Sequence, residues 1–107
     1  MKNKTLKELT DLCHKIAVEK GFWNGSFGVY GVAHRNTGEL LMLIVTELSE
    51  AMEAHRTEND ENFREEIADT FIRLFDLCGG LGIDIEKEIN KKCRKNKKRP
   101  YKHGKIC

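Results

Sequence analysis

The run of six apolar residues from Leu40 to Val45 is the sequence feature that most constrains the fold. A helix that starts near residues 36–37 can continue through this run to about Arg56. Because its first half is apolar nearly all round, we expect a central, buried helix. Glu47 and Glu50 follow the run directly and lie one helical turn apart, so two charges are expected next to the core.

Two further helices are predicted on either side of this one. Thr5-x-x-Glu8 has the form of a capping box, and apolar residues then recur at helical spacing, which predicts a helix over about residues 5–20. A later helix is expected to begin at Asn59 or Asp60 and to end at Gly79-Gly80. Its expected inward stripe comprises Phe63, Ile67, Phe71, Leu74, Leu77 and Cys78.

A fourth helix is expected from Ile83-Asp84 to the basic run before Pro100, with Ile85, Ile89 and Cys93 facing inward. Residues 21–38 hold five glycines and four aromatic residues without helical periodicity, which predicts a loop that carries large side chains. Four helices with short connections favour an all-α fold, an up-and-down bundle in a single domain over residues 1–107.

The composition agrees with a helix-rich protein, because 39% of the residues are hydrophobic and 34% are charged, with one proline. The four cysteines form no C-x-x-C pair, so we expect reduced thiols and no cysteine-bound zinc. No apolar stretch is long enough to span a membrane or to act as a leader. These features predict a cytoplasmic protein.

The net charge of +2 conceals an uneven distribution. Residues 1–90 carry 10 Lys and Arg against 17 Asp and Glu, whereas residues 91–107 carry nine Lys and Arg and no acid. Such a basic tail is either a solvated extension or a contact for phosphate or nucleic acid.

Two pairs of carboxylates share one spacing on consecutive predicted helices. Glu47 and Glu50 are three residues apart, and so are Glu66 and Asp69, which leaves each pair on one face of its helix. If the two helices pack antiparallel, the pairs can face each other. Four carboxylates in one place repel one another unless a cation neutralises them, and hard oxygen ligands suit Mg²⁺ or Mn²⁺.

The competing interpretation is an ordinary solvated surface. Asp69 could form an i,i+4 ion pair with Arg73 along a polar stripe, and the spacing of either carboxylate pair is common on exposed helices. Two features favour the metal site: Glu47 follows a run too apolar for the surface, and the basic tail could neutralise an anion held by the metal.

A family resemblance rests on these residues together with the tail. Glu47-x-x-Glu50, a 15-residue gap and Glu66-x-x-Asp69 are followed by Lys92-x-x-x-Asn96-x-x-Arg99, and this order resembles the MazG-like branch of the all-α nucleoside triphosphate pyrophosphohydrolases. The segments FWN, GELLMLIVTELSEAMEA and RPYKHGK are similar to that family as well, so the likeness covers most of the chain. Many members have a glutamate where this chain has Thr46. Any accessory role that this additional carboxylate has in the family is therefore in doubt for this chain.

The resemblance implies a fold of four or five helices that is completed by dimerisation, as a homodimer or homotetramer. It implies Mg²⁺-dependent hydrolysis of (deoxy)nucleoside triphosphates between the α and β phosphates, in nucleotide-pool housecleaning, with Mn²⁺ as a substitute ion. The four carboxylates would hold the metal and serve catalysis, and which of them activates water is left open.

The resemblance also assigns residues that would bind the substrate. Lys92, Asn96 and Arg99 recur at intervals of four and three, so they share a helix face expected to point toward the metal, where they would bind the triphosphate. Trp23, with Phe22 and Asn24, would form a wall against which the base stacks, although a lone tryptophan is also a common plug for one end of a core.

Two other functions are weighed against this enzyme. One is a non-catalytic helical interaction module whose basic tail binds nucleic acid; it does not explain the two equally spaced carboxylate pairs. The other is a family member that binds nucleotide without turnover, against which the intact motif residues argue. We therefore expect a nucleoside triphosphate as substrate, and neither a membrane nor a nucleic acid as partner.

Overall fold

The computed structural model describes residues 3–23 and 36–101, and these residues form four helices without a strand. The helices are α1 (Leu6–Glu19), α2 (Thr37–Arg56), α3 (Asp60–Leu81) and α4 (Ile85–Lys97). The predicted all-α class and the four predicted helices are confirmed. The greater part of the glycine-rich segment, including Asn24, lies outside the described residues.

The first three helices begin where the sequence predicted, and each start is capped by a side chain. Thr5 and Glu8 form a capping box at α1, in which the Glu8 backbone N–H donates to Thr5 Oγ1 over 3.2 Å. Asn36 accepts from the Glu39 N–H at the start of α2, and Asn59 caps α3. These hydrogen bonds satisfy backbone donors that the first helical turn leaves without partners.

The end of α3 differs from the sequence prediction. Gly79 and Gly80 do not stop the helix, which continues to Leu81 and ends at Gly82 in the left-handed conformation, with φ of 70°. A Cβ at Gly79 would lie 2.6 Å from His14 Cβ, and one at Gly80 would overlap the Trp23 ring. The two glycines therefore serve close packing rather than helix termination.

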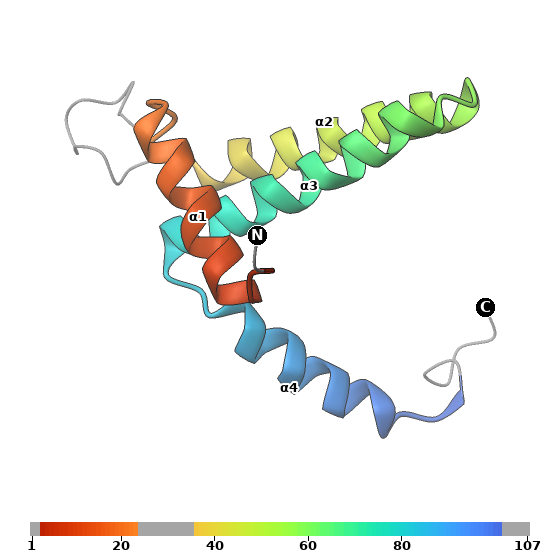
Figure 1. Cartoon of the computed structure of the whole chain (residues 1–107). Helices are drawn as coiled ribbons and strands as arrows, with labels where there is room; N and C mark the ends of the chain where they lie inside the picture. Colours follow the sequence, from red (N-terminus) through yellow and green to blue (C-terminus); the bar gives the residue numbers. More distant parts are fainter. Residues whose placement is uncertain (1–2, 24–35, 102–107) are drawn as a thin grey trace.

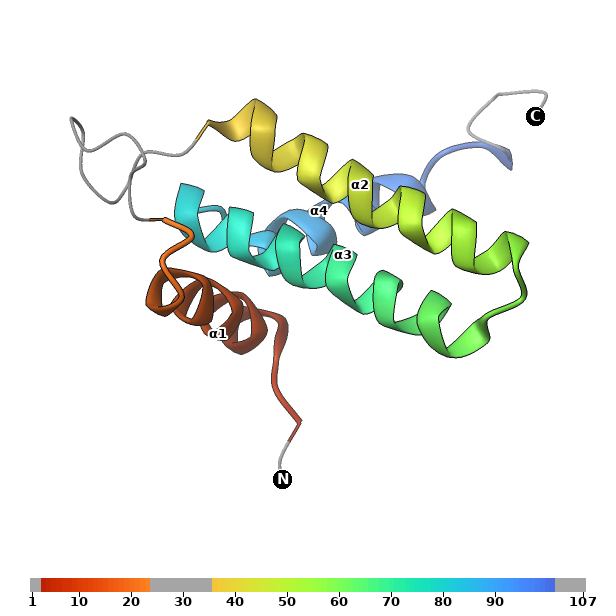
Figure 2. The same cartoon turned by 90° about the horizontal axis from the view of Figure 1, so that it is seen from above.

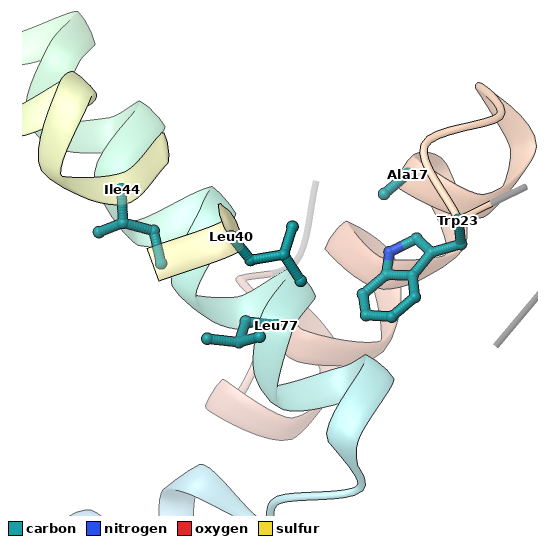
Figure 3. Close-up of a cluster of buried hydrophobic side chains, with 5 residues drawn as sticks. All are labelled: Ala17, Trp23, Leu40, Ile44 and Leu77. Atoms are coloured by element: carbon teal, nitrogen blue, oxygen red, sulfur yellow. The ribbon is translucent and has the colours of Figure 1, made fainter. Parts of the chain in front are cut away.

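The helices α2 and α3 form an antiparallel hairpin, and α1 packs across the C-terminal half of α3 (Figures 1 and 2). Five buried side chains from α1, α2, α3 and the turn after α1 make the core, as Figure 3 shows. They are Ala17, Trp23, Leu40, Ile44 and Leu77. A core of this size covers only one side of each helix.

The other side of α2 and α3 is apolar and exposed. The prediction that the first half of α2 is buried holds for Leu40 and Ile44, but Met42 is 62% exposed and Val45 is 50% exposed. Phe71, expected in the inward stripe of α3, is 54% exposed. Apart from Leu81 at the end of α3 and Ile72, which borders the space toward α1, the exposed apolar residues of the two helices are Leu41, Met42, Val45, Leu48, Met52, Phe71 and Leu74. We call this set the apolar face.

The last helix leaves the other three. In Figure 1, α4 runs away from the α2–α3 hairpin, and its main contact is a small one with α1. No residue of α4 is buried, so the expectation that Ile89 and Cys93 point inward is wrong for this chain alone. The αL residue Gly82 redirects the chain here, and Asp84 caps the new helix.

Candidate functional site: a carboxylate cluster between two helices

Glu47 lies in the buried stripe of α2. The stripe consists of Leu40, Ile44, Glu47, Ala51 and Ala54, which recur at helical spacing and face α3. Glu47 is only 9% exposed, so the helix that buries the apolar run places this carboxylate in the same seam. Glu50 lies one turn later and is exposed.

Helix α3 supplies two carboxylates to the same seam. Glu47, Glu66 and Asp69 each offer an oxygen atom, and these atoms all lie within 4.8 Å of one another. Glu50 is close enough to Glu66 to affect its protonation. Antiparallel packing thus brings the two predicted pairs together, and we call Glu47, Glu50, Glu66 and Asp69 the carboxylate cluster.

The electrostatics of the cluster are unusual at Glu66. Its Oε2 atom is buried and has no hydrogen-bond partner among the described residues. A protonated Glu66 carboxyl can share its proton with Glu50 and with Glu47, and these interactions, helped by burial and by the two negative charges, raise the pKa of Glu66 to about 7. Glu66 itself therefore has acidic neighbours and no cationic partner among the described residues.

One cation already lies beside the cluster. Arg73 Nε donates to Glu47 Oε1 over 2.9 Å, from α3 to α2. The i,i+4 pair of Arg73 with Asp69, which would make Asp69 an ordinary surface residue, is not the pair that forms. The sequence pattern does not predict Arg73 as a site residue; its position in the polar stripe of α3 is the one signal that points to it.

A cavity of about 270 Å³ opens next to the cluster, between α1, α2 and α3. Its lining combines carboxylates and a guanidinium with mostly apolar side chains. The lining residues are Cys13, Ile16, Ala17, Phe22, Glu47, Asp69, Ile72, Arg73 and Asp76. An apolar pocket with a few polar groups at one end is typical of a small-molecule site.

The two aromatic residues proposed as a base wall have different environments. Phe22 lines the cavity and is 60% exposed, whereas Trp23 is only 3% exposed and belongs to the core. The Trp23 Nε1–H donates to Asp76 Oδ1 over 2.7 Å, and His14 Nδ1 lies 2.9 Å from the same atom. This geometry favours the core plug for Trp23 and leaves Phe22 as the wall.

The predicted phosphate ligands are not brought to the cluster within this chain. Lys92 and Asn96 lie on α4, Arg99 follows it, and all three are exposed. None of them lines the cavity. The expectation that they face the carboxylates is therefore wrong for a single chain, because α4 packs mainly against α1 and leads away from the hairpin (Figure 1).

The donor set fits a divalent cation. Carboxylate oxygens from Glu47, Glu66 and Asp69 are the hard ligands that Mg²⁺ and Mn²⁺ prefer. The buried Glu66 Oε2 has no hydrogen-bond partner among the described residues, and a divalent cation could serve as its partner. Glu50 can complete the set from the exposed side.

The sequence can also be compared with known protein families. Within the described part of the chain, no helix is long and apolar enough to cross a membrane. No curated protein and no solved structure matches the chain. A model of the MazG-like family matches residues 37–106, which include α2, α3 and α4 and make up well over half of the sequence, so the chain belongs to the MazG-like family.

Proposed function

We propose that this protein is a Mg²⁺-dependent nucleoside triphosphate pyrophosphohydrolase, which releases a nucleoside monophosphate and pyrophosphate. Membership of the MazG-like family suggests a nucleotide pyrophosphatase-type function. The observation that carries the proposal is the carboxylate cluster, in which three residues from two helices hold oxygens within 4.8 Å of one another beside an open cavity.

The cluster suits hydrolysis of a phosphoanhydride. Glu47, Glu66 and Asp69 would hold a Mg²⁺ ion, which would neutralise charge on the phosphate oxygens and make water easier to deprotonate. A carboxylate of the cluster orients the attacking water and accepts its proton. The water oxygen adds to one phosphorus of the α–β linkage, and the bond from that phosphorus to the bridging oxygen breaks. The bridging oxygen leaves on the other fragment, which gives monophosphate and pyrophosphate.

The cavity suits the nucleoside. Phe22 offers an exposed ring in the lining of the cavity, and Ile16 and Ile72 add apolar surface. A base that stacks there would hold its phosphates toward Glu47 and Asp69. Trp23 belongs to the core and does not line the cavity, and a base contact from Asn24 stays a prediction outside the described residues.

The active assembly that we propose is a homodimer or a pair of dimers. The apolar face of α2 and α3 would be covered by a second copy, since large apolar side chains that gather on exposed helices mark interaction sites. The same assembly would bring Lys92, Asn96 and Arg99 of one chain to the cluster of another, where they would bind the triphosphate.

Solution mass tests this assembly. Met42→Glu places a charge on the apolar face without touching the core of the chain, so we expect a shift from dimer or tetramer to monomer in light scattering. Lys15→Glu alters charge on the exposed surface of α1 and serves as the control. A wild-type monomer would contradict the proposed assembly.

The reaction is tested with Mg²⁺ and a panel of ribo- and deoxyribonucleoside triphosphates. We expect pyrophosphate as the first product and loss of turnover when EDTA removes the metal. Orthophosphate as the first product would contradict cleavage between the α and β phosphates. Absence of turnover together with tight binding to DNA or RNA would favour the helical interaction module with its basic tail.

A further inference from the structure

Arg73 is a cation that lies beside the carboxylate cluster and pairs with one of its members. Its Nε–H donates to Glu47 Oε1 over 2.9 Å, and the Glu47 side chain is only 12% exposed. A carboxylate so far from water requires a counter-charge. In the described residues, Arg73 is the group that provides it.

This ion pair differs from the other Lys and Arg pairs of the described helices. Arg64 bonds Asp60 on its own helix, and Lys7 bonds Asp11 in the same way, and these four side chains are each more than 60% exposed. Pairs of that kind contribute little and are screened by salt. The bond of Arg73 instead links two helices and ends on a proposed metal ligand.

Arg73 also lines the cavity. It lies four residues after Asp69 on the same face of α3, and both side chains border the space beside Phe22. Its Nε is engaged by Glu47, while the two Nη groups form no hydrogen bond with the described residues. A guanidinium that lines a pocket and has unused N–H donors can bind a phosphate or another anionic oxygen.

We propose that Arg73 exchanges with the metal at Glu47: it neutralises Glu47 in the metal-free protein, is displaced by the divalent cation, and then contacts a phosphate of the substrate in the adjoining cavity. The inference rests on the proposed function, since it takes the carboxylate cluster as the metal site. It adds a substrate contact within a single chain, whereas the Lys92, Asn96 and Arg99 contacts require the assembly.

The exchange is tested by metal binding without nucleotide. Arg73→Gln keeps a donor for Glu47 but removes the competing charge, so the affinity for Mn²⁺, measured from the spin-resonance signal of the free ion, should rise on the order of five-fold. Arg73→Lys keeps the charge and should stay near the wild type. Arg64→Gln, a pair of similar length on the same helix, is the matched control and should leave the affinity unchanged.

Kinetics test the substrate contact separately. With Mg²⁺ saturating, the KM of the nucleotide should rise roughly ten-fold in both Arg73→Gln and Arg73→Lys, because a lysine cannot offer two parallel N–H donors. The Arg64→Gln variant should keep the wild-type KM. Circular dichroism should show that each variant retains its helices. If Arg73→Gln is unstable, the KM of Arg73→Lys alone still tests the phosphate contact.

The outcomes separate this inference from the function on which it rests. Weaker or unchanged Mn²⁺ affinity in Arg73→Gln would overturn the exchange, and an unchanged KM in both variants would overturn the phosphate contact, in each case with hydrolysis by the wild type intact. Failure of the wild-type protein to bind Mn²⁺ would overturn the metal site and the exchange together.

Discussion

The α2–α3 hairpin carries the four carboxylates expected in the site, whereas α4 and the residues just after it carry the expected phosphate ligands, and the two regions pack differently. The hairpin packs its carboxylates into a seam, where Glu47 is 9% exposed and Glu66 Oε2 is buried. Helix α4 carries its cations on a surface with no buried residue. The acidic half of the site is therefore built by packing within one chain, and the basic half is not.

Local interactions explain how α4 forms without such packing. Asp84 accepts from the Lys87 N–H at its start, Glu86 and Glu88 lie in its first turn, and Arg94, Lys95 and Lys97 lie in its last turn. Acids at the N-terminus and bases at the C-terminus both favour the helix dipole. Ile85 and Ile89 follow one side of this helix and are available to a partner.

The largest expected effect comes from the buried half. Glu66→Gln removes a charge from the centre of the cluster, so turnover should fall by about a thousandfold or more while the helical content stays that of the wild type. Glu65→Gln, the exposed neighbour on the same helix, is the matched control and should retain activity. Equal activity of the two variants would remove Glu66 from the site.

Mixing two inactive variants tests whether the halves come from different chains. Glu66→Gln lacks a carboxylate and Arg99→Ala lacks a phosphate ligand, so a co-refolded mixture contains mixed dimers in which one site has both wild-type halves. We expect recovery of about a quarter of wild-type activity from random pairing. No recovery above the two separate variants would place both halves in one chain.

Substitutions of the two aromatic residues after α1 should have different effects, one on substrate binding and the other on stability. Phe22→Ala should raise the nucleotide KM by about three- to ten-fold with little change in thermal midpoint, because the ring lines the cavity. Trp23→Ala should lower the free energy of unfolding by about 3–5 kcal/mol, because it empties part of the core. A stable Trp23→Ala protein with a raised KM would restore Trp23 as the base wall.

The smallest effect is the pH dependence of stability in the metal-free protein. The pKa of Glu66 is about 7 in the folded chain against an ordinary 4.5, so the folded state binds the extra proton between these values. The resulting stabilisation is complete below the ordinary pKa and is lost as the pH rises through about 7. In EDTA the thermal midpoint should thus fall over this range more steeply than in Glu66→Gln; identical slopes would contradict the raised pKa.

The stabilisation that a divalent metal ion gives should have the opposite pH dependence. A divalent ion binds the deprotonated carboxylate, so Mg²⁺ should stabilise the protein more as the pH rises toward and above about 7. Calorimetry in buffers of different ionisation enthalpy should detect proton release on metal binding below that pH.

Sequence periodicity predicted the elements that depend on local signals. The capping residues Thr5, Asn36 and Asn59 begin three helices as expected, because each hydrogen bond closes within a few residues. The three-residue spacing of each carboxylate pair, combined with antiparallel packing, also predicted that Glu47, Glu66 and Asp69 meet. Their role as metal ligands stays a prediction.

What the sequence did not predict depends on contacts between helices. The continuation of α3 through Gly79 and Gly80 follows from the close approach of His14 and Trp23, which no local pattern encodes. The ion pair of Arg73 with Glu47 crosses from one helix to another, whereas spacing along one helix pointed to Asp69. The direction of α4 after Gly82 is likewise a property of packing.

The most direct test of the account is phosphorus-31 NMR of the reaction in water enriched in oxygen-18, with Mg²⁺ and a nucleoside triphosphate that the assay panel identifies as a substrate. The account predicts monophosphate and pyrophosphate in equal amounts, with one labelled oxygen on one of the two products and no reaction in EDTA. Release of orthophosphate as the first product, or the same rate without a divalent ion, would contradict it.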